Sequence, residues 1–182
     1  MKKGLLFLAV FLMGFAVKSV AQADGEYYLY NAASKCFLSH GDSWGTRAVV
    51  DKYGSPVLWN STEGSLKFLD NNLCLFETDD NFFFTDNNST GFTFVETTDG
   101  YYLQSKKTNS YAMLAEGVSS KLQQILLPST DQGTAAVWQL KTKAERDAMV
   151  AAYVGENYAN VIAAASMDAT AQSSTAKLPH FT

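Results

Sequence analysis

An acidic residue followed by glycine recurs three times at nearly equal intervals along this chain. The pairs are Asp24-Gly25, Glu63-Gly64 and Asp99-Gly100, and successive glycines are 39 and 36 residues apart. Each pair favours a turn, and each is followed by a short apolar run. A fixed period of about 20–50 residues is the signature of a repeated structural unit. We therefore expect three related units.

Within each unit, four short runs rich in aromatic or β-branched residues alternate with polar turns. Runs of this kind, bounded by Gly, Asn, Asp or Ser, are typical of β-strands. The expected strands are 27–30, 36–38, 46–50 and 56–59, then 66–69, 73–76, 82–85 and 92–95, then 101–103, 111–114, 122–127 and 135–140. The pattern predicts an all-β, β-trefoil-like domain over residues 24–140, made of three four-stranded units and followed by a C-terminal α-helical segment.

The fourth run of each unit carries a large aromatic residue at a matching place. These residues are Trp59, Phe94 and Trp138, and their neighbours are apolar. A ring of this size buries about 150–250 Å². We expect all three rings to pack in a shared core rather than to form ligand platforms.

At Thr142 the sequence pattern changes from short strand-like runs to one typical of a helix. Thr142-Lys143-Ala144-Glu145 fits a capping box, in which Thr and Glu satisfy each other's backbone N–H groups. Apolar periodicity predicts an amphipathic helix over 143–154, ended by Gly155, and a second short helix over 157–165. Residues 141–165 are thus a helical segment, and 166–182 are expected to form a linker or frayed tail.

The first 23 residues have the composition of a signal peptide. Lys2 and Lys3 precede an apolar run of 13 residues, 5–17, and Ala21-Gln22-Ala23 fits a cleavage site. The alternative is an uncleaved membrane anchor, but a spanning helix needs about 20 apolar residues. We expect a periplasmic or secreted protein with no membrane span after cleavage.

Charge narrows the range of partners. Cleavage leaves 159 residues, and the loss of three lysines leaves 11 basic against 18 acidic residues, a formal charge of −7. Nucleic acids and anionic lipid surfaces both require a basic footprint. We expect neither to be a partner.

Two cysteines, Cys36 and Cys74, lie in apolar stretches. Export permits a disulfide between them. The alternative is a pair of buried thiols that act as small hydrophobic groups. Only geometry decides between these two states.

Catalytic and metal-binding patterns are weak. His40 and His180 are the only histidines, and sequence neighbours of His40 on a strand would point to opposite faces. Two cysteines and one histidine in the domain make no zinc pattern. The calcium-like start at 86–91 has no closing Glu and is better explained as a polar turn, and Asp79-Asp80 as a solvated loop end. We expect no enzyme activity, no cofactor and no metal.

The segment Gly41-Asp42-Ser43-Trp44-Gly45-Thr46-Arg47 is the best candidate ligand site. An exposed Trp44 would stack on the apolar face of a sugar, while Asp42 accepts hydrogen bonds from hydroxyls and Arg47 donates them. The alternative is that Trp44 folds under its hairpin and caps the barrel, because Trp is highly buried on average.

Three units of about 40 residues that close on Ala136-Val137-Trp138-Gln139-Leu140 resemble a β-trefoil of the ricin-type lectin superfamily. The resemblance covers residues 24–140. Repeats of that superfamily tend to end in Gln-x-Trp, whereas here Gln139 follows Trp138, and the second unit has Phe94. The resemblance therefore implies the fold, and no sugar-binding residue is carried over.

Three further stretches look like N-terminal modules of exported Bacteroidetes proteins. They are Tyr27-Tyr28-Leu29-Tyr30-Asn31, the segment from Asp42 to Ala48, and Trp138-Gln139-Leu140-Lys141-Thr142-Lys143-Ala144-Glu145-Arg146. Such modules are often followed by a helix and further domains. This resemblance implies either a short member of the group or a truncated one.

These observations lead to two hypotheses about function. The first is a non-catalytic, exported carbohydrate-binding module with a glycan as partner. The second is a structural or protein-interaction module at the N-terminus of a larger surface or secreted protein, with another exported protein as partner.

Maturation is expected after Ala23, because Ala-x-Ala precedes Asp24. N-terminal sequencing of the exported protein should read Asp-Gly-Glu-Tyr. Recovery of the exported chain with Met1 intact would contradict this prediction.

Overall fold

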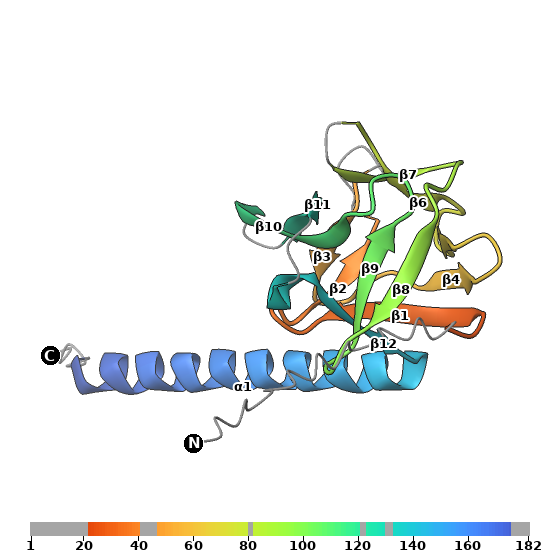
Figure 1. Cartoon of the computed structure of the whole chain (residues 1–182). Coiled ribbons are helices and arrows are strands. Elements are labelled where there is room, and N and C mark those ends of the chain that lie inside the picture. The colour runs from red at the N-terminus through yellow and green to blue at the C-terminus, as the bar shows by residue number, and fades with distance from the viewer. Residues whose placement is uncertain (1–21, 41–46, 80–81, 121–122, 130–132, 176–182) are drawn as a thin grey trace, which may run out of the picture.

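One curled antiparallel sheet and one long C-terminal helix make up the architecture (Figure 1). It is seen in a computed structural model that describes residues 22–40, 47–79, 82–120, 123–129 and 133–175. The predicted signal peptide, apart from its last two residues, lies outside the described residues.

Each described strand overlaps one of the runs expected from the sequence, so the all-β prediction for the domain is confirmed. The strands are β1 (Gly25–Asn31), β2 (Cys36–Ser39), β3 (Val49–Asp51), β4 (Val57–Asn60), β5 (Ser65–Phe68), β6 (Cys74–Glu77), β7 (Phe83–Asp86), β8 (Phe92–Glu96), β9 (Tyr101–Ser105), β10 (Tyr111–Ser120), β11 (Gln123–Ser129) and β12 (Val137–Lys141). A short 3-10 helix, η1 (Thr134–Ala136), precedes β12.

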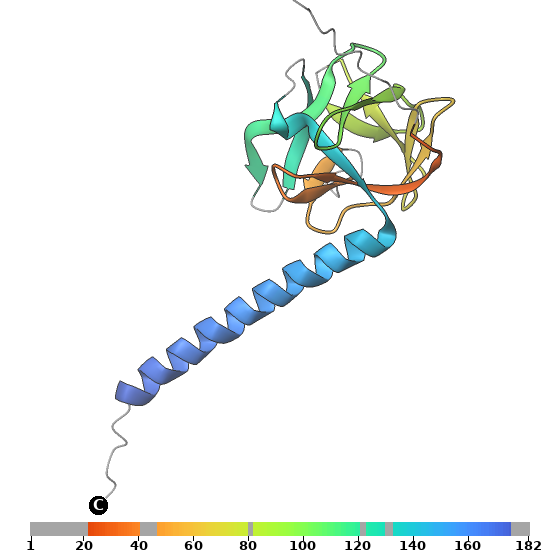
Figure 2. The ribbon, with the colours of Figure 1, turned by 60° about the horizontal axis from the view of Figure 1, so that its bottom comes forward.

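The sheet curls because its first and last strands pair. β1 contacts β12 in antiparallel register, with Tyr30 opposite Gln139, and it also pairs with β2 and β4. The hydrogen-bonded path runs β12-β9-β10-β11-β3-β2-β1-β4-β5-β6-β7, and β8 pairs with β9. In Figure 2 the strands wrap around a common interior.

Alternating side chains fill that interior. In β7, for example, Phe83 and Thr85 are buried and Phe84 and Asp86 face outward, which is the period of two that a strand imposes. Trp59, Phe94 and Trp138 are 4%, 2% and 0% exposed, so their predicted place in the core is confirmed. The Trp138 indole Nε1 donates to the Ala112 carbonyl over 2.9 Å, which satisfies its buried polar atom.

Helix α1 (Lys143–Thr175) begins at the predicted capping box. The Glu145 carboxylate accepts hydrogen bonds from the Thr142 backbone N–H and from Oγ1, each over 2.7 Å. The Glu145 N–H donates back to Thr142 Oγ1 over 3.3 Å. This reciprocal pair satisfies backbone donors that the first turn leaves open.

The helix differs from its prediction in length. It passes through Gly155 without interruption and includes residues 166–175, which the sequence analysis assigned to a tail. Glycine in a helix costs about 1 kcal/mol relative to alanine, and the alanine-rich sequence on both sides favours continuation. No helix among the described residues is long and apolar enough to cross a membrane.

The first turns of α1 rest on β1. The Arg146 guanidinium lies 4.4 Å from the centre of the Tyr28 ring, and its Nη2 donates to the Tyr28 hydroxyl over 3.0 Å. Tyr153 still contacts the sheet side, where the Lys52 ammonium lies 5.6 Å from the centre of its ring. Beyond Glu156 the described side chains of the helix are exposed, and the helix projects away from the sheet (Figure 2).

The capping box should stabilise the start of α1 in a pH-dependent way. Hydrogen bonds from Thr142 hold the pKa of Glu145 below its usual value. A lowered carboxyl pKa gives stability that is present above the ordinary pKa, about 4.3 for Glu, and is lost as the pH falls through the lowered value. Thr142→Ala removes the N-cap hydroxyl, so it should reduce the helix content and lower the free energy of unfolding by about 1 kcal/mol.

Circular dichroism with urea unfolding measures both effects. Glu145→Gln should be less stable than the parent at neutral pH, and the difference should vanish in acid. Glu96→Gln, at an exposed position on β8, is the control. A Glu145→Gln difference that persists in acid would rule out this capping role.

Candidate functional site

Only one of the three predicted ligand-binding residues lies in the described part of the chain. Arg47 is placed at the exit of the 41–46 segment, whereas Asp42 and Trp44 lie outside the described residues. Whether the three side chains converge is therefore still a prediction. The described part of this candidate site is Arg47 with the residues around it.

Two phenylalanine rings lie beneath the Arg47 guanidinium. Its carbon is 5.6 Å from the centre of the Phe82 ring and 5.8 Å from that of Phe84. Arg47 pairs with Phe84 through an isolated antiparallel bridge, and the next residue, Ala48, donates its N–H to the Phe83 carbonyl over 3.0 Å. Backbone pairing thus fixes Arg47 over the outer face of β7, within the range of cation–π attraction.

The two rings share a face because they are two residues apart. Phe83, between them, is fully buried, so Phe82 and Phe84 project outward and are half-buried. The run Phe82-Phe83-Phe84 in the sequence indicates outward-facing rings. Side chains alternate between the two faces of a strand, so either Phe83 or the pair Phe82 and Phe84 must face outward. The sequence analysis missed the two outer rings as partners of Arg47.

His40 lies at the other end of the 41–46 segment. Its Nε2 is 3.5 Å from Asp70 Oδ2, and its ring meets the Phe68 ring edge-on at 6.0 Å between centroids. The side chain is 27% exposed, so it is neither fully buried nor freely solvated. The segment that carries Asp42 and Trp44 therefore begins and ends at residues held against aromatic rings.

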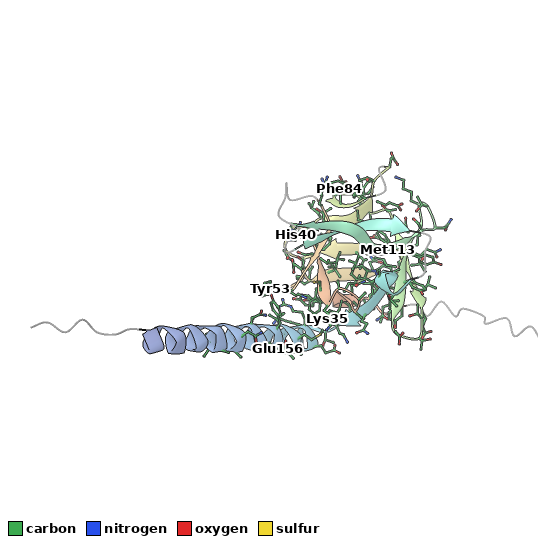
Figure 3. All side chains as sticks on the ribbon, turned by 90° about the vertical axis from the view of Figure 1, so that its left-hand side faces the viewer. Lys35, His40, Tyr53, Phe84, Met113 and Glu156 are labelled. Atoms are coloured by element: carbon green, nitrogen blue, oxygen red, sulfur yellow. The ribbon has the colours of Figure 1, made fainter. Side chains whose placement is uncertain are left out.

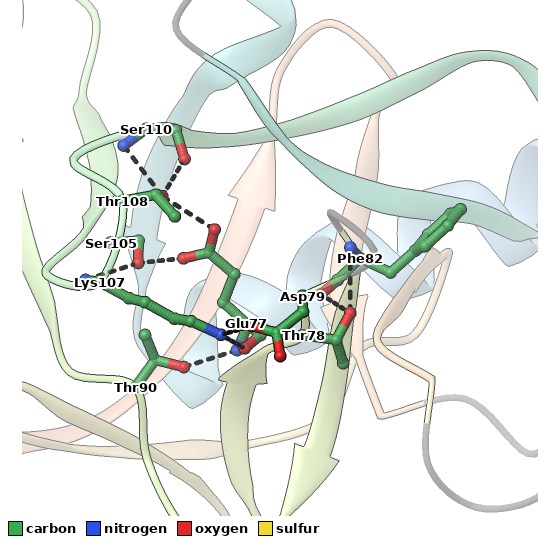
Figure 4. A network of polar contacts seen from close by, with 9 residues as sticks. All are labelled: Glu77, Thr78, Asp79, Phe82, Thr90, Ser105, Lys107, Thr108 and Ser110. Atoms are coloured by element: carbon green, nitrogen blue, oxygen red, sulfur yellow. Dashed lines mark hydrogen bonds and ion pairs between the residues drawn. The ribbon is translucent and has the colours of Figure 1, made fainter.

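A buried polar network supports the turn that presents Phe82 (Figure 4). Its centre is Glu77, which is 0% exposed. Ser105 Oγ donates to one carboxylate oxygen, and Thr108 Oγ1 donates to the other over 2.8 Å. The Glu77 N–H donates to Thr90 Oγ1 over 2.6 Å. A buried carboxylate is tolerated only when it is hydrogen-bonded in this way.

Lys107 connects this network to the turn at 78–82. Its ammonium donates to the Glu77 carbonyl over 3.3 Å and to the Asp79 carboxylate over 2.5 Å (Figure 4). The hydrogen bond from Lys107 holds the pKa of Asp79 below its usual value, so this carboxyl is ionised at neutral pH. The Asp79 side chain is 94% exposed, which agrees with a solvated loop end.

Thr78 closes the same turn. Its N–H donates to the Phe82 carbonyl over 2.9 Å, and its hydroxyl bonds to the same carbonyl over 3.1 Å. The chain thus links a buried carboxylate, a closed turn and an outward aromatic ring. The Arg47 guanidinium places hydrogen-bond donors beside the faces of two half-buried aromatic rings.

Neither a metal centre nor a disulfide is found in the described residues. No group of three or more His, Cys, Asp or Glu side chains there has metal-binding geometry. Cys36 and Cys74 are both free and partly buried. The Cys36 thiol donates to the Ser34 carbonyl over 3.4 Å, and burial raises the pKa of the Cys74 thiol. Of the two states left open by the sequence, the structure has the thiols.

No protein-family model matches the chain, and no curated protein gives a significant match. Among solved structures, one similar fold is a Caenorhabditis elegans protein of unknown function from a structural genomics programme. The TM-score is 0.50 and the sequence identity 13%, and the match covers 69% of this chain and 97% of the other. Likeness at this identity concerns the fold alone.

The Glu77 network should contribute strongly to stability. Glu77→Ala leaves the Ser105 and Thr108 hydroxyls without their acceptor, and a hydrogen bond to a charged group contributes about 1.5–3 kcal/mol. We expect Glu77→Ala to lower the free energy of unfolding, measured with urea, by about 3 kcal/mol or more. The decrease should be smaller for Glu77→Gln, which keeps one acceptor oxygen.

Glu96→Ala is the matched control, because Glu96 is an exposed glutamate at a strand end. Its effect should stay within about 0.5 kcal/mol. If Glu77→Ala were as mild as this control, the network would not be a stabilising element.

Proposed function

We propose that the sheet is a β-trefoil of three related four-stranded units. Three hairpins support this: β2–β3, β6–β7 and β10–β11 are each antiparallel neighbours. Three non-glycine residues with left-handed backbone, Lys35, Asn72 and Asn109, follow one another at intervals of 37 residues. Each lies one or two residues before the first strand of one of these hairpins.

We further propose that the domain is a non-catalytic, exported glycan-binding module. The observation that carries the proposal is the position of Arg47 over Phe82 and Phe84, at the exit of the segment that contains Trp44. Aromatic rings stack on the apolar faces of sugars, and a guanidinium donates in a fixed fork to hydroxyls or carboxylates.

In this proposal the Trp44 ring stacks on the sugar, Arg47 donates hydrogen bonds and Asp42 accepts them from hydroxyls. Neutral and acidic sugars both fit, because Arg47 pairs equally well with a carboxylate. The formal charge of −7 after cleavage of the signal peptide repels heavily sulfated chains at long range. The resemblance to exported Bacteroidetes modules is in keeping with a periplasmic or secreted location.

A second candidate function is protein interaction, and one observation favours it. Helix α1 exposes Val154, Tyr158 and Ile162, which are 48%, 68% and 50% exposed and follow one another at intervals of four residues. Residues at this interval share a helix face. In this reading the module presents or spaces other domains through α1.

A glycan array probed with the mature protein tests the first function. Arg47→Ala and Trp44→Ala should each weaken binding at least about tenfold, as expected when a stacking or charged hydrogen-bonding contact is lost, with little change in the melting temperature. Tyr53→Ala is the control, because Tyr53 is an exposed aromatic residue, 55% exposed, on a different turn.

Two outcomes would count against glycan binding at this site. If Trp44→Ala unfolds the domain, the ring belongs to the core, as in the alternative considered from the sequence. If the parent protein gives no array signal at high concentration, the interaction function is favoured.

A further inference from the structure

A groove lies between α1 and the sheet, away from the Arg47 surface. It encloses about 320 Å³, a size at the lower end of small-molecule sites. The sheet side contributes Tyr30, Lys35, Phe37 and Lys52, and the helix side contributes Tyr153 and Glu156. In Figure 3, Lys35 and Glu156 are labelled on the two sides of this junction.

The walls of the groove are aromatic. The Tyr30 and Phe37 rings pack against each other at 4.9 Å between centroids on the sheet side. Burial raises the pKa of the Tyr30 hydroxyl, so it stays neutral and is available as a hydrogen-bond donor. Tyr153 faces them from α1. Phe37 is only 2% exposed, so it backs the half-buried Tyr30 ring, and the aromatic surfaces open to a ligand are those of Tyr30 and Tyr153.

Two lysines make one part of the groove cationic. The Lys52 ammonium donates to the Lys35 carbonyl over 2.8 Å and lies 5.6 Å from the centre of the Tyr153 ring. The Lys35 ammonium forms no ion pair within the described residues. With Glu156 as the single carboxylate in the lining, two positive charges face one negative charge. This balance favours a ligand with one negative charge.

The backbone at Lys35 indicates that the fold does not require lysine there. Its φ is 54°, in the left-handed region that a long side chain rarely adopts. At the corresponding places, 37 and 74 residues further along, the chain uses Asn72 and Asn109, with φ of 61° and 57°. Asparagine tolerates this conformation far better. A strained residue where two related turns use the relaxed one points to a role outside folding.

We propose that this groove binds a small aromatic monocarboxylate. The aromatic ring of the ligand lies between Tyr30, which Phe37 backs, and Tyr153, and the ligand carboxylate pairs with the Lys35 ammonium. Lys52 adds positive potential and keeps α1 in place through Tyr153. The proposal concerns a different surface from Arg47 and does not depend on glycan binding.

The test uses 3-phenylpropionate as the probe, with 3-phenylpropanamide as its neutral counterpart. Binding to the mature protein is followed by saturation-transfer NMR and titration calorimetry. The parent should bind the carboxylate at least tenfold more tightly than the amide. Lys35→Asn should weaken carboxylate binding at least tenfold and bring it close to that of the amide.

The same variant should keep or raise the melting temperature, because asparagine relieves the strained turn. Lys67→Asn, which removes a lysine from β5 outside the groove, is the matched control and should leave affinity unchanged. Tyr153→Ala should weaken both probes, since it removes one aromatic wall.

Three results would overturn the proposal. They are absence of carboxylate binding at millimolar concentration, equal binding of the carboxylate and the amide, and unchanged affinity in Lys35→Asn. A lower melting temperature in Lys35→Asn would contradict the argument that the fold itself does not need this lysine.

Discussion

The pairing of β1 with β12 is the constraint on which the rest of the molecule depends. It joins the start and the end of the sheet in register over Tyr28 to Asn31, so the sheet curls and encloses Trp138 and the other buried rings. It also determines where the chain leaves the sheet. Because β12 ends beside Tyr28, α1 starts there, and Arg146 reaches the Tyr28 ring within its first turn. The groove lined by Tyr153 and Lys35 exists because α1 begins at this edge.

The charged side chains of the sheet domain are placed in two ways, either buried among hydrogen-bond donors or held at the surface. Glu77 is sealed inside, where hydroxyl donors replace water and fix the adjacent turn. Arg47 and Lys35 lie at the surface, where Arg47 is placed by its backbone bridge to Phe84 and Lys35 by a left-handed turn. A rigid interior network under an outward charged side chain is a way to preorganise a binding surface, because less side-chain freedom is lost when a ligand binds.

Much of the fold could be predicted from the sequence, because strand signals are local. Turn residues and alternating aromatics located the strands, the core position of Trp59, Phe94 and Trp138, and the capping box at Thr142. The length of α1 could not be predicted, since a glycine often ends a helix, whereas here the alanine-rich sequence on both sides of Gly155 carries the helix through it. The partners of Arg47 and of Glu77 come from distant strands, and such contacts leave no signal at fixed spacing. The Lys35 groove could not be foreseen, because it depends on how α1 lies against the sheet.

The exposed length of α1 also has a mechanical meaning. A helix of 33 residues is about 50 Å long, and the contacts that Arg146 and Tyr153 make with the sheet side lie in its first half. The part beyond Tyr153 is about 33 Å long, so a tilt of about 5° at Tyr153 would move the far end by about 3 Å. Arg146 and Tyr153 set the direction of the helix, so a small change in their packing would displace its far end by several times as much.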